Sequence, residues 1–382
     1  MHTLYALDSR TGKSRWHFTA NGPIDSPPTI HRGLAFFGSR DGWVYCLDAK
    51  SGALVWKFSD TPTVRLICDS EQLESAWPVN GSVMVKNGLV YFAAGRSSFL
   101  DGGIVVYALN AETGEVKHRR VMAGPYDEKN FPRVQRGSTF RSEGFKSGIF
   151  SSDGENLYIR HQGFEPDLSP ISPYDIKTPH LMASTGFLCP LPQHRTYWTI
   201  DTDLRYGPPK GVATTGPQGD IIAVDGKAFY EVRGYYVGRH PQRDVNPLKM
   251  YHVFAGEDMP SSKGRKSKGG AASVPRTGNW KKRWATNTPF AGHAILVAGE
   301  TLVVAGVPIR ADFSLEDIEA SYEGKRGGML WTLSTLSGNK TGELELQAAP
   351  VWDGLAAADG YCYLSLKDGT VLCLGERSRK GP

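Results

Sequence analysis

The sequence predicts an all-β repeat protein, and three observations support this prediction. Residues 5–16 and 45–56 are close copies of one unit, and they begin 40 positions apart. A third copy covers residues 107–118. The 382-residue chain is also rich in turn-forming residues, with 44 Gly and 24 Pro, and it contains no apolar run long enough to span a membrane. Strand-rich repeats of about 40 to 45 residues are typical of propeller blades, so the predicted fold is a β-propeller of four-stranded blades.

Each position of the repeat has a physical role, which the first copy illustrates. Tyr5 and Leu7 alternate along a strand so that one of its faces is apolar. Asp8 ends the strand by accepting hydrogen bonds from backbone amides that follow it. Gly12 supplies the positive φ of a hairpin. Trp16 is large enough to fill the space between neighbouring twisted sheets. Repetition of this unit therefore predicts stacked sheets joined by indole contacts.

The strand pattern predicts a single propeller domain over residues 1–382 with seven or eight blades. We expect complete blades at residues 27–58, 81–120, 146–200, 220–285 and 292–347, and partial blades at residues 3–18 and 349–374. Either the first strands complete the last sheet, which would remove an exposed edge, or the first blade is truncated; we expect the latter, in a fragment of a longer bacterial protein. The basic segment 261–278 lacks apolar residues and is predicted to be a flexible loop.

At this point the chain resembles the quinoprotein-like β-propellers. Their repeat runs Ala-x-Asp-x-x-Thr-Gly-x-x-x-Trp after a turn such as Gly38-Ser39-Arg40-Asp41-Gly42. The motif is clear over residues 1–120 and partial over residues 345–375. The resemblance implies a propeller similar to that of the outer-membrane assembly lipoprotein, or a quinone-dependent dehydrogenase. It also implies an exported or periplasmic location, although no signal peptide is visible in the chain.

Candidate ligand-binding residues lie where propeller loops meet one face. Six cations come directly after the second strand of successive blades: Arg40, Arg96, Arg160, Arg233, Arg310 and Lys367. Guanidinium groups bind carboxylates and phosphates bidentately, so these cations would favour an anionic ligand, unless they pair with neighbours such as Asp41 or Asp101. Four further candidates complete the predicted rim: Trp77, Asp101, Glu143 and His293.

No catalytic motif or metal site is predicted. The chain has no vicinal Cys-Cys pair and no Ser-His-Asp or His-Glu-x-x-His motif. His161, Asp167, Asp175 and His180 could in principle bind a metal, but their irregular spacing favours a structural segment. We therefore expect no cofactor; the alternative is pyrroloquinoline quinone with calcium, held near Arg96.

Three functions remain open. The first is a non-catalytic scaffold that binds a protein or a small anionic ligand through its loop-rich face. The second is a quinone- and calcium-dependent oxidoreductase of alcohols or sugars, with Trp77, Arg96, Asp101 and Glu143 near the cofactor. The third is a module that binds carbohydrates or polyanions. The net charge of +5 is too small to imply a nucleic acid partner, so we expect none.

Overall fold

The computed structural model describes residues 2–69, 71–124, 147–160, 162–172, 175–183, 198–202, 206–207, 211–212, 216–226, 228–233, 251–257, 262–263, 276–277 and 280–375. The chain divides into two compact units. Unit 1 comprises Met1–Leu191, Ile200–Thr214 and Ser262–Thr277. Unit 2 comprises Pro192–Thr199, Thr215–Ser261 and Gly278–Pro382.

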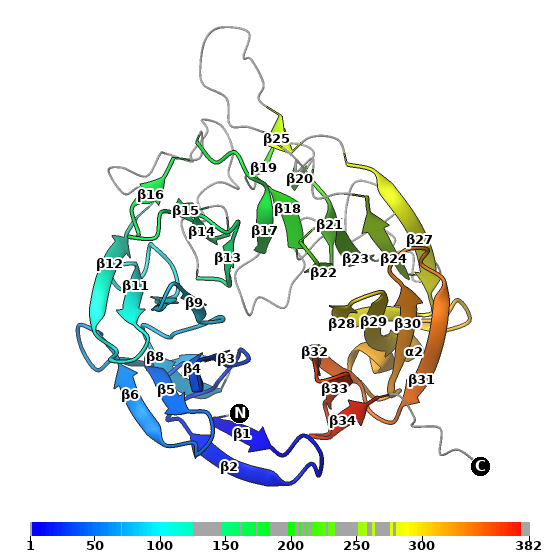
Figure 1. Ribbon diagram of the computed structural model, residues 1–382, viewed down its shortest axis with the longest axis horizontal. Coiled ribbons are helices and arrows are strands. Elements are labelled where there is room, and N and C mark those ends of the chain that lie inside the picture. Colours follow the sequence, from blue (N-terminus) through cyan, green and yellow to red (C-terminus); the bar gives the residue numbers. More distant parts are fainter. Residues whose placement is uncertain are drawn as a thin grey trace, which may run out of the picture. The chain divides into compact units, whose positions relative to one another are not determined.

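Unit 1 is built from antiparallel sheets whose strands pair in chain order (Figure 1). The first sheet has two strands, β1 (Thr3–Leu7) and β2 (Ser14–Thr19). Three four-stranded sheets follow. They are β3 (Thr29–His31), β4 (Leu34–Gly38), β5 (Val44–Asp48) and β6 (Leu54–Phe58); β9 (Met84–Lys86), β10 (Leu89–Ala94), β11 (Ile104–Asn110) and β12 (Val116–Met122); and β13 (Phe150–Ser152), β14 (Leu157–Ile159), β15 (Gln162–Phe164) and β16 (Pro170–Ile171).

Shorter elements lie between or after these sheets. A hairpin of β7 (Leu66–Asp69) and β8 (Gln72–Ser75) is inserted between the second and third sheets of unit 1. The strand β17 (His180–Ala183) follows β16, and β18 (Trp198–Asp201) is divided between the units. Two short pairs complete unit 1: β19 (Tyr206–Gly207) with β20 (Gly211–Val212), and β25 (Ser262–Lys263) with β26 (Arg276–Thr277).

Unit 2 repeats the same meander. After β21 (Gln218–Gly219), its two four-stranded sheets are β22 (Ile221–Val224), β23 (Phe229–Arg233), β24 (Tyr251–Gly256) and β27 (Lys282–Thr288); and β28 (Phe290–Ala298), β29 (Thr301–Pro308), β30 (Gly328–Ser334) and β31 (Lys340–Leu346). A three-stranded sheet follows, with β32 (Pro350–Ala358), β33 (Tyr361–Leu366) and β34 (Val371–Leu374). Helix α2 (Leu315–Tyr322) is inserted between β29 and β30. The predicted fold class, an all-β propeller of four-stranded blades, is confirmed.

The tryptophan of each repeat packs on the hairpin of the next sheet, as the sequence predicts. The indole Nε1–H of Trp16 donates to the Ala49 carbonyl at 3.2 Å. A Cβ at Gly52 would lie 2.6 Å from the Trp16 ring. The backbone φ of Gly52 is +75°, and that of the equivalent Gly12 is +68°. The hairpin therefore requires glycine at Gly52. The same bond joins Trp56 to Ala111 in unit 1, at 3.0 Å, and Trp284 to Thr335 in unit 2, at 2.9 Å.

The repeat aspartates also act as expected. Oδ1 of Asp8 accepts the backbone N–H of Arg10 at 3.1 Å and of Thr11 at 2.9 Å. Oδ1 of Asp48 accepts the N–H of Ser51 at 2.7 Å. These bonds satisfy the turn amides and fix the hairpin on which the preceding tryptophan packs.

The strands around residues 146–200 differ from the expectation. A blade of four strands was expected to extend to residue 200, but the four-stranded sheet is complete by residue 171, with β15 and β16 as its last two strands. The strand β16 has only two residues and begins with Pro170. Proline lacks a backbone donor but is tolerated on an edge strand. The short edge strand β16 was therefore not predicted, because the segment that contains it is rich in proline.

Two other features were not predicted from the repeat. One is the β7–β8 hairpin, and the other is α2, which begins with a capping box between Ser314 and Asp317. The expected basic loop at 261–278 lies outside the described residues except for β25 and β26. In the described part of the chain, no helix is long and apolar enough to cross a membrane.

Candidate functional site

A cluster of ion pairs lies where the β7–β8 hairpin meets two sheets of unit 1. Glu74, on β8, has a side chain that is 2% exposed. Its Oε2 accepts from Nη1 of Arg40 at 3.1 Å, and its Oε1 pairs with Nη2 of Arg96. Asp25 accepts from Nε of Arg40 at 2.5 Å. Asp69 lies 3.7 Å from Arg40 and 3.5 Å from Arg96. The cluster thus binds one buried carboxylate between two guanidinium groups.

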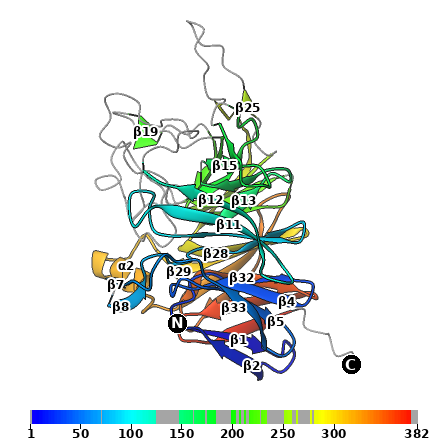
Figure 2. The same cartoon turned by 90° about the vertical axis from the view of Figure 1, so that its left-hand side faces the viewer.

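The repeat explains why these two arginines meet. Arg40 follows β4 and Arg96 follows β10, so they occupy equivalent positions after the second strands of neighbouring sheets. The hairpin is fixed above them by a backbone bond from the Ser75 N–H to the Arg40 carbonyl at 2.8 Å. In Figure 2, β7 and β8 lie to the left of β4 and β5. The turns that follow the second strands therefore carry the inserted hairpin.

The structure brings Arg40 and Arg96 together, but their charges are already matched by acids. Three carboxylates surround these two guanidinium groups. Removing one partner of a buried pair leaves an uncompensated charge, which costs several kcal/mol. The cluster is therefore suited to holding the hairpin in place. The prediction that these two residues bind an anion stays a prediction.

Trp77 and Asp101 anchor the base of the hairpin. Trp77 is 7% exposed, and its indole Nε1–H donates to the Asp101 carbonyl at 2.8 Å. Asp101 has a φ of +53°, and its Oδ1 pairs with Nη1 of Arg65, which directly precedes β7. The ring of Trp77, a candidate of the predicted rim, is thus buried and bonded to the Asp101 carbonyl, so Trp77 is a packing residue in this structure.

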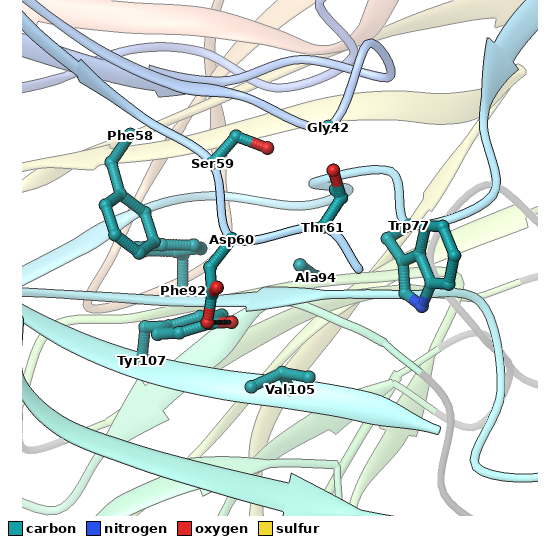
Figure 3. A pocket seen from close by; sticks show the side chains of 10 residues that line it. All are labelled: Gly42, Phe58, Ser59, Asp60, Thr61, Trp77, Phe92, Ala94, Val105 and Tyr107. Atoms are coloured by element: carbon teal, nitrogen blue, oxygen red, sulfur yellow. Dashed lines mark hydrogen bonds between the residues drawn. The ribbon is translucent and has the colours of Figure 1, made fainter. Parts of the chain in front are cut away.

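A small pocket lies next to Trp77 (Figure 3). Phe58, Phe92 and Tyr107 line one side, with the Phe92 and Tyr107 rings stacked at 5.2 Å between centroids. The Tyr107 hydroxyl donates to Oδ2 of Asp60 at 2.9 Å. Burial, and then the hydrogen bond to Asp60, raise the pKa of Tyr107. Tyr107 is therefore a neutral donor at physiological pH.

Arg160 and His180 are buried within unit 1. The Arg160 side chain is among the largest fully buried ones, and its Nε donates to the Ala183 carbonyl at 3.4 Å. Nε2 of His180 lies 2.9 Å from the Arg160 carbonyl. Burial lowers the pKa of His180 to about 4, so the ring is neutral near pH 7. The expectation that Arg160 faces an open rim is wrong, because it is enclosed by its own unit.

The remaining candidates lie in unit 2 or outside the described residues. Arg233 ends β23, and Arg310 follows β29 and pairs with Asp312 at 3.3 Å. Lys367 follows β33 and is exposed. Burial, and then the charge of Lys367, lower the pKa of His293 to about 4. Glu143 and His161 lie outside the described residues.

The described residues offer no ready calcium site. Nowhere in the described ranges do three or more His, Cys, Asp or Glu side chains form a group that could hold a metal ion. The carboxylates of Asp25, Asp69 and Glu74 lie around Arg40 and Arg96, and all three pair with arginine. A bound dication would have to displace these guanidinium groups. The described residues thus do not identify a set of calcium ligands.

Comparison with known proteins places the chain among quinoprotein-like repeats. The family model "Outer membrane protein assembly factor BamB" matches residues 1–142. The dehydrogenase subunit of the quinone alcohol dehydrogenase of Komagataeibacter europaeus is 32% identical over 127 residues, which cover 30% of this chain and 16% of that protein. Quinoprotein alcohol dehydrogenase PedH of Pseudomonas putida is 26% identical over 201 residues, covering 50% of this chain and 31% of that protein. The chain thus matches less than a third of either relative's length.

Two solved structures are similar to the chain at low identity. BamB from Moraxella catarrhalis superimposes with a TM-score of 0.41 at 13% identity, covering 97% of this chain and 78% of that chain. A quinohemoprotein alcohol dehydrogenase from Pseudomonas putida HK5 gives a TM-score of 0.49 at 14% identity, covering 95% and 66%.

These relatives correct one expectation. The sequence predicted no cofactor, but the curated proteins that match are named as quinone dehydrogenases. The prediction of a chain without a cofactor is therefore wrong on these comparisons. The expectation rested on the missing Cys-Cys pair and the missing catalytic motifs, which do not decide whether a quinone binds. Residues 1–142 match this family model, and the repeats and four-stranded sheets of the chain are similar to those of the quinoprotein-like β-propellers.

Proposed function

We propose that this propeller is a binding scaffold that holds a protein partner on the β7–β8 hairpin. The observation that carries the proposal is an exposed apolar surface, which we call the hairpin patch. Val64 is 95% exposed, Leu73 is 65% exposed, and Leu66 is 56% exposed. The other members of the hairpin patch are Cys68 on β7, and Phe99 and Leu100 in the turn before β11. Exposed apolar side chains gathered on one element are a feature of protein–protein interaction sites.

The register of the hairpin explains how one element serves two purposes. Leu66 pairs with Ser75 and Cys68 pairs with Leu73, so Leu66, Cys68 and Leu73 share one face. Ile67 and Glu74 form the alternate pair on the opposite face. The inner face therefore carries the buried carboxylate that binds the two arginines, and the outer face carries apolar side chains.

The ion pairs make the hairpin patch a rigid surface. Glu74 fixes β8 to Arg40 and Arg96, and Arg65 fixes the start of β7 to Asp101. A preordered surface loses less conformational entropy when a partner binds, which favours affinity. This arrangement supports a docking role for the outer face.

The test compares the hairpin patch with a matched surface. The double variant Leu66→Ser with Leu73→Ser removes two apolar side chains from the patch. The control, Leu336→Ser with Leu344→Ser, makes the same change at two exposed leucines of unit 2. Proteins retained from an extract of the source cells should be lost by the first variant and kept by the control. Equal retention by both variants would contradict the proposal.

The relatives support a second function, quinone-dependent oxidation of alcohols. The matched proteins are quinone alcohol dehydrogenases, and pyrroloquinoline quinone is a polycarboxylate that suits the anionic ligand expected at the predicted rim. Titration with the quinone and Ca²⁺, followed by absorbance and by dye-linked alcohol oxidation, tests this function. Arg233→Ala and Lys367→Ala test the rim, since the structure records no ion pair for either side chain in the described part of unit 2. Unchanged quinone affinity in both variants would exclude them as ligands.

We further propose that the chain acts outside the cytoplasm. The matched family model describes an outer membrane protein assembly factor. Fusion of the full-length protein to a reporter that is active only after export would test this location.

A further inference from the structure

We infer that the partner binds as an extended strand along the free edge of β7, so that the hairpin becomes a three-stranded sheet. This inference deepens the proposed function and rests on it. It identifies the partner by its backbone conformation and by the pattern of its side chains, and it assigns the binding groups to main-chain atoms of Leu66 and Cys68.

The hydrogen-bond parity of the hairpin fixes which backbone groups point outward. The Ala76 N–H donates to the Arg65 carbonyl at 2.9 Å, so residues 65 and 76 form a hydrogen-bonded pair. In an antiparallel ladder such pairs alternate with non-hydrogen-bonded ones. The pairs Leu66 with Ser75 and Cys68 with Leu73 are therefore non-hydrogen-bonded. Their N–H and C=O groups point away from the partner strand.

One of the two outer edges is already used. The Ser75 N–H, which points away from β7, donates to the Arg40 carbonyl at 2.8 Å. This bond attaches the edge of β8 to the turn after β4. On the other edge, no main-chain hydrogen bond within the described ranges involves Leu66 or Cys68. The edge of β7 therefore offers two N–H and two C=O groups at a two-residue spacing, which is the template for strand addition.

The surrounding side chains indicate the partner's sequence. Leu66 and Cys68 are exposed on the outer face, so a third strand would place apolar side chains beside them at alternate positions. Asp69 and Glu71 lie at the turn end of the hairpin. The side chain of Asp69 is half-exposed, and its Oδ2 lies 3.5 Å from Nη2 of Arg96. Arg65, at the other end, is paired with Asp101. Charge complementarity thus favours a basic residue of the partner at the turn end.

The experiment uses peptides selected on the full chain. A phage-displayed library of random linear peptides is panned on the immobilised protein, and enriched peptides are synthesised with and without N-methyl groups at alternate amides. We expect alternating apolar residues with a Lys or Arg at the end that meets Asp69 and Glu71. N-methylation on the bonding edge should weaken binding by at least about tenfold, because each lost backbone hydrogen bond contributes about 1 kcal/mol. Bound peptide should slow hydrogen exchange at the amides of Leu66 and Cys68.

The outcomes separate this inference from the proposed function. Peptides that lose binding to the Leu66→Ser, Leu73→Ser variant but tolerate N-methylation on either edge would overturn strand addition and leave the hairpin patch as a docking surface. Peptides that protect other segments, or no enrichment at all, would overturn the inference as well. Protection of both edge amides, together with sensitivity to N-methylation on one edge only, supports it.

Discussion

Two insertions interrupt the regular sheets, and they are attached to their units in different ways. The β7–β8 hairpin of unit 1 is held by Glu74, whose carboxylate is buried between Arg40 and Arg96. Helix α2 of unit 2 is preceded by an ion pair at the surface, in which Asp312 is 69% exposed beside Arg310. Buried pairs are costly to break, whereas exposed pairs contribute little. The comparison indicates that the hairpin has one fixed position, while α2 depends on local capping and packing.

Removing the buried carboxylate should have the largest effect. Glu74→Ala leaves two guanidinium groups without their shared partner, so we expect a loss of about 3 to 5 kcal/mol of unfolding free energy. The measurement is urea denaturation followed by tryptophan fluorescence. Glu71→Ala, on the exposed turn of the same hairpin, is the control and should change stability by less than about 0.5 kcal/mol. Equal effects of the two variants would show that the cluster does not hold the hairpin.

The second-largest effect is expected on acidification, which should destabilise unit 1 because His180 becomes protonated. Burial lowers the pKa of His180 to about 4, below the ordinary value of 6.5. The unfolded chain then binds more protons between these two values, so stability is lost as the pH falls from about 6.5 towards 4. The full effect is roughly 3 kcal/mol at the low end. His180→Gln should flatten this part of the curve of stability against pH, and an unchanged slope would exclude His180 as the cause.

The cap of α2 should contribute less. The Ser314 hydroxyl accepts the Asp317 N–H at 3.1 Å, so Ser314→Ala should cost about 1 kcal/mol of local stability. Hydrogen exchange of the α2 amides measures it. Ser314→Asp retains an accepting side chain and should restore protection. If both variants exchange at the wild-type rate, α2 is held by packing alone.

The smallest effect is expected at the exposed ion pair that precedes α2. Asp312→Ala removes the partner of Arg310, but both side chains are more than half exposed. We expect less than about 1 kcal/mol, with the effect vanishing at high salt. A loss comparable to that of Glu74→Ala would remove the distinction between the two insertions.

The regular parts of the fold could be predicted because the residues of the repeat act through short-range contacts. Asp8, Gly12 and Trp16 each act within one hairpin or across one neighbouring sheet, so their spacing predicted the blades. That Arg40 and Arg96 lie close together could be anticipated only in part. Their equivalent positions after second strands were visible, but two of their acidic partners, Asp69 and Glu74, come from a hairpin outside the repeat.

Other features lacked a signal of this kind. The strand β16 is two residues long and begins with Pro170. A short segment that begins with proline is typical of a loop. The hairpin patch was missed because Leu66, Cys68 and Leu73 look like an ordinary alternating strand until the pairing shows which face is covered. The sequence left open whether Trp77 packs inside the protein or stacks on a ligand, because it could not show the bond to the Asp101 carbonyl. Such contacts depend on packing between elements distant in the chain.

The most direct test of the account is hydrogen exchange across the hairpin in the free protein. We predict slow exchange at the amides of Ile67 and Glu74, which form a hydrogen-bonded pair, and at Ser75, which donates to Arg40. The amides of Leu66 and Cys68 should exchange rapidly, since they lie on the free edge. Uniformly rapid exchange would show that the hairpin is not fixed, and slow exchange at Leu66 and Cys68 would show that the proposed docking edge is already covered.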